Sequence, residues 1–97
     1  MTQRRLVLSD EAVEDIARRA ETLRDARGAA FALDWTDALL DWLERIAEAG
    51  AQLGTEHPTA PEFRTFGYRR QATVLARFEP ETLTVVRLYF PGQDWSR

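Results

Sequence analysis

The sequence contains one histidine, His57, between Glu56 and Pro58. Histidine is the residue type that most readily takes up and releases a proton near neutral pH, so this position is the first candidate for acid–base chemistry. It falls in the stretch TEHPTAP (55–61), whose two prolines predict a loop rather than a helix or a strand. We therefore expect His57 to be an ordinary exposed loop residue.

Metal and thiolate chemistry find little support in the residue types. The chain has one histidine and no cysteine, which leaves only oxygen ligands for a metal ion. No spacing of His, Asp and Glu suggests a site, and no glycine-rich phosphate loop or G-x-S-x-G motif occurs. We expect no metal and no cofactor.

The arginines of the C-terminal third are better candidates for a binding surface. Arg64 begins a predicted strand, Arg69 and Arg70 lie where two predicted strands meet, and Arg87 lies inside an apolar strand. A charge in that last position needs a partner, so Arg87 is either in an ion pair with Asp or Glu or exposed in a groove of the sheet. Arg69 and Arg70 are either a solvated pair or a contact for a partner's phosphate or carboxylate.

Charge is unevenly distributed along the 97 residues. The net charge is -3, yet residues 61–97 carry six arginines against four acids. A mildly basic half can suit nucleic acid or an acidic partner segment, or it is simply a solvated mixed surface. The length and the hydrophobic content of 44% predict one domain, residues 1–97. No apolar run is long enough for a membrane span and no signal peptide is recognisable, so we expect a cytoplasmic protein.

Three antiparallel strands are predicted at about residues 63–68, 72–78 and 83–90. Their β-branched and aromatic residues suit a half-buried pleated surface, and Pro80 favours a turn between the last two strands. Val74, Ala76 and Phe78 share one face of the second strand. A sheet with one apolar face must bury it against other elements, and the rest of the chain offers two helices.

The first helix is predicted to follow a short strand at residues 4–8, with Ser9 or Asp10 as its N-cap. Val13, Ile16, Ala20 and Leu23 are among the apolar residues that repeat at helical spacing, and Asp15 with Arg19 has the spacing of a surface ion pair. Gly28 is the natural terminator. A second helix is predicted over about residues 29–49. The two should form an antiparallel hairpin; the alternative is one long helix kinked at Gly28.

Aromatic residues give the second helix a broad stripe that contains Phe31, Trp35 and Trp42. The two tryptophans are seven residues apart on one face, so they are either core or partly the wall of a groove. Trp95 near the C-terminus either caps a sheet edge or is an exposed contact. The predicted order is β-α-α-β-β-β, an α+β fold with a helical hairpin packed on a small antiparallel sheet.

Three segments resemble the ParE/RelE superfamily of type II toxins. The opening VLSDEAVEDI (7–16) resembles the family's usual start, a strand followed by Ser, Ala and a "DI" or "DL" pair. Arg64-Thr65-Phe66 resembles the "R-x-F" that begins the family's sheet. The closing VVRLYFPGQDW (85–95) resembles the V-L-R-V-L-H-G-A-R-D-W that ends many ParE-like toxins. In that comparison the family's His falls on Phe90 and its last Arg on Gln93, so both are replaced here.

This resemblance implies a RelE/ParE-like fold and a toxin that binds DNA gyrase without chemistry of its own. It also implies a hetero-oligomer with a cognate antitoxin, a ParD-like protein with a ribbon-helix-helix or similar DNA-binding part. The antitoxin's C-terminal segment would fold on the helices and a sheet edge. The candidate target contacts are Arg64, Arg69, Arg70, Arg87 and Trp95, and the candidate antitoxin contacts are Phe31, Trp35, Trp42 and Tyr89.

Two alternatives remain open. A RelE-like ribosome-dependent mRNA endoribonuclease would use the arginines for phosphate charge and His57 or Tyr68 as the proton group. The sequence is poor in the residues that such a ribonuclease would use, since it has no lysine and Thr73 lies near the position of the RelE sheet arginine. A degenerate, non-toxic interaction module would explain the replaced family His and Arg.

Overall fold

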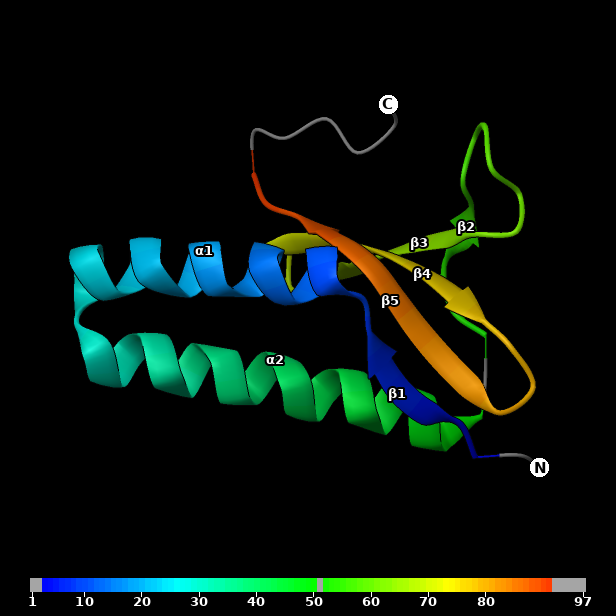
Figure 1. Ribbon diagram of the computed structural model, residues 1–97, viewed down its shortest axis with the longest axis horizontal. Coiled ribbons are helices and arrows are strands. Elements are labelled where there is room, and N and C mark those ends of the chain that lie inside the picture. The colour runs from blue at the N-terminus through cyan, green and yellow to red at the C-terminus, as the bar shows by residue number, and fades with distance from the viewer. Residues whose placement is uncertain (1–2, 51, 92–97) are drawn as a thin grey trace.

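The computed structural model describes residues 3–50 and 52–91 and shows two helices packed on one mixed sheet (Figure 1). In chain order the elements are β1 (Arg5–Leu8), α1 (Asp10–Arg27), α2 (Ala29–Ala49), β2 (Thr55–Glu56), β3 (Arg64–Tyr68), β4 (Ala72–Phe78) and β5 (Thr82–Tyr89). The strands lie in the order β1-β5-β4-β3-β2, with β1 parallel to β5 and the other neighbours antiparallel. The predicted α+β fold is confirmed, but the sheet is mixed rather than antiparallel, because the N-terminal strand joins it parallel to β5.

The connection after α2 differs from the prediction. Residues 55–61 were expected to be loop throughout, whereas Thr55 and Glu56 form the two-residue strand β2 opposite Thr65 and Arg64. The two prolines that argued against a strand come after this pair in the sequence, so they do not interrupt its ladder.

The helical hairpin follows from its caps. The Ser9 hydroxyl accepts a hydrogen bond from Ala12 N–H at 3.0 Å, as an N-cap should, and α1 ends where Gly28 N–H donates to the Arg24 carbonyl. Gly28 has φ of 97°, which reverses the chain at no steric cost. The two helices run antiparallel on one side of the sheet, and their joined ends extend beyond it (Figure 1). The alternative of one long kinked helix is therefore wrong.

The core lies between α2 and the three long strands. Leu39 and Leu43 of α2 are fully buried against Val74, Leu83 and Val85. From α1 the buried apolar residues are Ala12 and Ile16, whereas Val13, which the predicted stripe included, is 50% exposed. The apolar face of α1 is thus rotated by about one residue from the prediction.

A β-bulge in β5 decides which way its C-terminal half faces. Leu75 pairs with Arg87 and Ala76 with Val85, so Val86 is an extra residue in the ladder. Before the bulge Leu83 and Val85 are buried, and after it the buried residue is Leu88. The bulge therefore keeps Arg87 out of the core and leaves it beside α1. In the part of the chain that the structure describes, no helix has the length and apolar character that crossing a bilayer requires.

Candidate functional site

Arg87 is joined to Asp15 of α1 by two hydrogen bonds. Its Nε donates to Asp15 Oδ2 at 2.8 Å, and its Nη2 donates to Oδ1 at 3.2 Å. Asp15 also accepts from Leu88 N–H at 3.0 Å and from Arg18 Nη2 at 2.9 Å. Of the two alternatives for Arg87, the structure shows the ion pair. Asp15 itself was predicted in a surface pair with Arg19, which is wrong: it is 4% exposed and pairs with Arg87 and Arg18.

The protonation of this pair follows from its contacts. Burial alone would raise the pKa of Asp15, but the hydrogen bonds from Arg87 and Leu88 N–H outweigh it and hold the pKa below its ordinary value. The hydrogen bond to Asp15 correspondingly raises the pKa of Arg87. Asp15 is therefore a carboxylate near neutral pH, and it holds α1 to β5.

The N-cap residue Ser9 and Asp15 of α1 cover the edge of β5 beyond the end of β1. Ser9 N–H donates to the Val85 carbonyl at 2.9 Å, and its hydroxyl donates to the Val86 carbonyl at 2.6 Å. Asp15 then accepts from Leu88 N–H. These contacts occupy backbone groups that another strand would otherwise pair with, so α1 protects this edge of the sheet.

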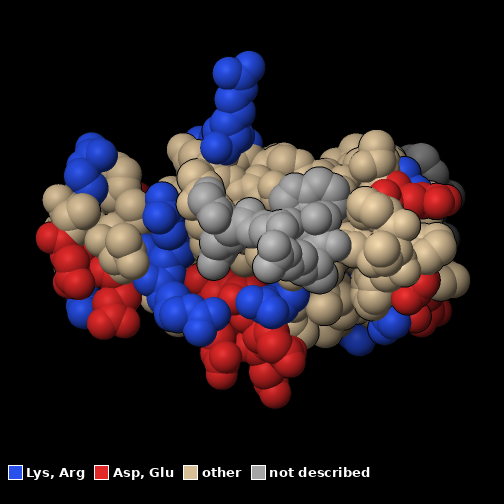
Figure 2. Space-filling view, turned by 90° about the horizontal axis from the view of Figure 1, so that it is seen from above, with Lys and Arg blue, Asp and Glu red and all other residues tan. Residues whose placement is uncertain are grey.

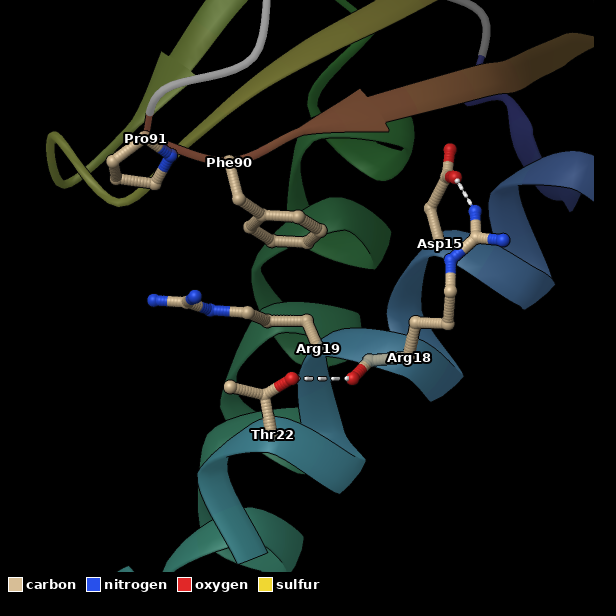
Figure 3. Close-up of a pocket in the computed structure, with 6 residues that line it drawn as sticks. All are labelled: Asp15, Arg18, Arg19, Thr22, Phe90 and Pro91. Carbon is tan, nitrogen blue, oxygen red and sulfur yellow. Dashed lines mark hydrogen bonds and ion pairs between the residues drawn. The ribbon is translucent and has the colours of Figure 1, made fainter. Parts of the chain in front are cut away.

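An open hollow of about 250 Å³ lies between α1 and the end of β5, lined by Asp15, Arg18, Arg19, Thr22, Phe90 and Pro91 (Figure 3). The two arginines turn away from each other. Arg18 turns towards Asp15, and Arg19 lies with its guanidinium carbon 5.4 Å from the centre of the Phe90 ring. Asp15 is shared between Arg18 and Arg87, so the lining of this hollow carries a net positive charge, with Arg19 against an aromatic ring.

Arg64 is also occupied. Its Nε donates to the Leu53 carbonyl at 2.9 Å, and its Nη2 donates to the Gly54 carbonyl. Gly54 has φ of 79°, and a Cβ there would lie 2.0 Å from the Thr65 carbonyl oxygen. Arg64 thus ties the segment after α2 closely onto β3.

Arg69 and Arg70 are exposed in the connection between β3 and β4. Both have positive φ, 48° and 60°, and Gln71 N–H donates to the Tyr68 carbonyl at 2.7 Å. This is the pattern of a type I′ turn, whose central positions favour Asn and Gly. A bulky residue in the left-handed region costs on the order of 1 kcal/mol. The Arg69 guanidinium lies 5.3 Å from the centre of the Tyr68 ring.

A second hollow of about 340 Å³ adjoins this turn. Its lining residues are Gly67, Arg70, Gln71, Ala72, Thr73, Tyr89, Phe90 and Pro91. Trp35 of α2 anchors the turn, because its indole N–H donates to Gln71 Oε1 at 3.0 Å and its ring packs 5.9 Å from that of Phe90. The turn is thus fixed to the helical layer.

The other aromatic candidates lie in different surroundings. Trp42 is half-buried against the rings of Phe66 and Tyr68, with centres 5.8 and 4.7 Å away. Tyr89 is half-buried under Arg87, and Phe31 is 37% exposed under Arg27. Trp95 lies outside the described residues. The structure therefore does not bring the candidate antitoxin contacts into one patch.

Both proposed proton groups are buried. His57 is 7% exposed and its Nδ1 accepts from Thr59 N–H at 3.2 Å, so the expectation of an exposed loop histidine is wrong. Its backbone N–H donates to the Phe63 carbonyl, which folds the loop over the ring. Tyr68 is 1% exposed in the core. No group of three or more His, Cys, Asp or Glu able to hold a metal ion occurs among residues 3–50 and 52–91.

Acidic and basic side chains are interspersed over part of the face in Figure 2, and one basic side chain stands out alone from its rim. The part of this face that lies outside the grey atoms therefore does not form one continuous basic surface of the kind that tracks a nucleic acid backbone.

Comparison with known proteins identifies a similar fold but no similar sequence. No protein-family model matches the sequence, and a search of curated proteins finds no similar sequence. Among solved structures, the chain is similar to one from the "Chromosomal ParDE TA system from P. aeruginosa", with a TM-score of 0.76 and 15% sequence identity. The match covers 91% of this chain and 96% of that chain. The ParE-like fold expected from the sequence is thus confirmed over nearly the whole chain.

Proposed function

We propose that this chain is the toxin of a type II toxin–antitoxin module and that it acts by binding DNA gyrase. The observation that carries the proposal is the fold, which matches a chain of a ParDE system over 91% of the present chain. Since the two sequences share 15% identity, the function is our inference from the fold together with the site.

Burial of the two proton-transfer candidates favours binding over RNA cleavage. A general acid or base must come within hydrogen-bond reach of the substrate. His57 is closed in by its own loop and Tyr68 is enclosed in the core, with exposed fractions of 7% and 1%. Neither is placed to reach a ribose or a phosphate without opening the fold, so this geometry supports a ParE-like binder rather than a RelE-like ribonuclease.

The helical hairpin supports an antitoxin as partner. A wide groove between α1 and α2 is lined mainly by small and apolar residues, namely Ala17, Ala20, Glu21, Arg24, Ala32, Leu33 and Thr36. Leu33 is 62% exposed and Phe31 37% exposed at the same end of the hairpin. An amphipathic helix of a ParD-like antitoxin would cover this surface.

A sheet edge is also open to a partner segment. The edge of β5 beyond β1 is covered by Ser9 and Asp15. At the opposite edge of the sheet, β2 pairs with Arg64 and Thr65 of β3, and among residues 3–50 and 52–91 no strand pairs with this side of β3 beyond Thr65. We propose that an extended part of the antitoxin adds to β3 beyond Thr65 and that toxin and antitoxin form a hetero-oligomer in the cytoplasm.

Expression of the chain with and without its neighbouring open reading frame tests the proposal. Alone, it should arrest growth with DNA damage and filamentation, and the neighbouring frame should restore growth. A ribonuclease would instead cut mRNA at the ribosomal A site without DNA damage. A degenerate interaction module would leave growth normal in both strains, and that outcome would overturn the proposal.

A further inference from the structure

The turn at residues 68–71 is built from residues that its backbone does not favour. Arg69 and Arg70 both occupy the left-handed region, with φ of 48° and 60°. Neither side chain is short enough to relieve that conformation through a local hydrogen bond, as Asn or Asp would. A turn selected for stability alone would carry Asn-Gly here. Strain that the fold does not need points to a function for the side chains.

The base of this turn is held firmly. Tyr68 is 1% exposed, and it pairs with Ala72 across the hairpin. Gln71 is bound at its side chain by the Trp35 indole and at its backbone by the Tyr68 carbonyl. Both guanidinium groups therefore start from a fixed backbone, which reduces the entropy lost when they bind a ligand.

The adjoining hollow gives a ligand room beside these groups. Arg70 lines it together with the Gly67 backbone, Thr73 and Tyr89. Gly67 is exposed and has no side chain to fill the space. A chain that placed an acidic group on Arg69 and Arg70 could thus continue along the hollow, with two hydroxyl groups available as hydrogen-bond partners.

The charge of the molecule favours carboxylates over phosphates as the ligand. Guanidinium groups bind both classes in the same forked geometry. A nucleic acid interface, however, needs a broad basic surface, and this chain has a net charge of -3. Two other arginines of the sheet are also engaged, Arg87 with Asp15 and Arg77 with Glu79. Two adjacent guanidinium groups match a short acidic peptide segment better than a polyanionic backbone.

We propose that the 68–71 turn recognises an acidic segment, with neighbouring carboxylates, on the protein that this toxin poisons. The inference rests on the proposed function and deepens it, since it names the recognition element and the chemistry of its ligand. It assigns Arg64 and Arg87 to holding the sheet in place, and Arg69 and Arg70 to the target.

The double variant R69N/R70G separates this role from a structural one. Asn-Gly suits the turn, so the variant should unfold at a Tm higher by about 5 °C. It should nevertheless lose growth arrest when expressed alone, while still co-purifying with the antitoxin. The matched control R5Q/R45Q removes two exposed arginines that lie outside the turn and should remain toxic. A stabilised variant that arrests growth as strongly as the wild type would overturn the inference.

Titration with polyglutamate and with a DNA duplex of similar charge tests the ligand class directly. The wild-type protein should bind polyglutamate more tightly than the duplex, and R69N/R70G should bind polyglutamate at least about ten-fold more weakly. R5Q/R45Q should keep most of the affinity. Preference for the duplex, or equal loss in both variants, would contradict an acidic-peptide site.

The two assays distinguish failure of this inference from failure of the proposed function. If the wild-type chain causes no growth defect, the toxin proposal fails, and the titration still decides whether the turn binds carboxylates. If the wild type is toxic and R69N/R70G is equally toxic, the toxin proposal stands and the turn is not its recognition element.

Discussion

Two groups of arginines in the sheet half of the molecule have opposite surroundings. Arg87 gives two hydrogen bonds to a carboxylate that is 4% exposed and that also binds the backbone of β5. Arg69 and Arg70 are exposed on a turn whose backbone disfavours them. The first arrangement joins a helix to a strand, whereas the second adds strain to a hairpin.

The difference shows that an arginine's position in the sheet does not by itself indicate binding. A guanidinium that satisfies a buried carboxylate contributes to folding, because loss of either partner leaves the other uncompensated. A guanidinium on a strained, solvated turn contributes little to folding, and its value must come from a ligand. Substitutions in the two groups should therefore change stability in opposite directions.

The largest effect is expected for Asp15→Ala. The substitution leaves Arg87 without its carboxylate and the Leu88 N–H without its acceptor, and should lower the free energy of unfolding by about 2–4 kcal/mol. Urea denaturation measures this. Asp25→Ala, at an exposed position of the same helix, is the control and should change the unfolding free energy by less than about 0.5 kcal/mol. Equal effects of the two substitutions would remove the assigned role of the Asp15–Arg87 pair.

Acid should remove the same stabilisation. The pKa of Asp15 is lower in the folded chain than its ordinary value of 3.8, so the folded state keeps a carboxylate that the unfolded state protonates. The contribution of Asp15 is complete above the unfolded pKa and is lost as the pH falls below it through the folded pKa. The free energies of unfolding of the wild type and of Asp15→Asn, measured by denaturation, should therefore converge at low pH. A difference that stays constant down to the acid limit would contradict this assignment.

A smaller loss is expected for Arg64→Gln. This removes the hydrogen bonds to the Leu53 and Gly54 carbonyls, which are partly accessible to water, and should cost about 1 kcal/mol. Hydrogen exchange should show the loss locally, as faster exchange in the ladder between β2 and β3. Unchanged protection of that ladder would mean that Arg64 does not hold it.

The smallest effect, and one of opposite sign, is expected for Arg70→Gly. Glycine relieves the left-handed conformation but gains entropy in the unfolded chain, so the net stabilisation should be about 0.5–1 kcal/mol. Thermal unfolding of Arg45→Gly, at an exposed position inside α2, gives the contrast, because glycine there should destabilise the helix. If both substitutions destabilised equally, the turn would not be strained.

Periodicity and caps predicted most of the fold. Ser9 as N-cap and Gly28 as terminator place both helices, and the strands at residues 64–68, 72–78 and 82–89 lie within one residue of the predicted ranges. The strand β2 was missed, because two residues are too few to show an alternating pattern and the prolines that follow them dominate the local signal.

The candidate site was less predictable, because it depends on contacts between distant residues. Asp15 lies 72 positions before Arg87, and no local signal joins them. Asp15 lies three residues after Ala12 and directly before Ile16, and all three are buried. A prediction that centred the apolar face of the helix on Ala12 and Ile16, rather than on Val13, would have identified Asp15 as a buried carboxylate. The positive φ of Arg69 and Arg70 could not be expected either, since arginine gives no preference for that conformation.

A gyrase supercoiling assay with the purified chain tests the central claim, that this fold acts by binding, most directly. We predict that the protein blocks supercoiling and accumulates linear DNA, that added antitoxin reverses both effects, and that R69N/R70G produces neither. Unaffected gyrase, together with mRNA cut at the A site of translating ribosomes by the same preparation, would contradict it.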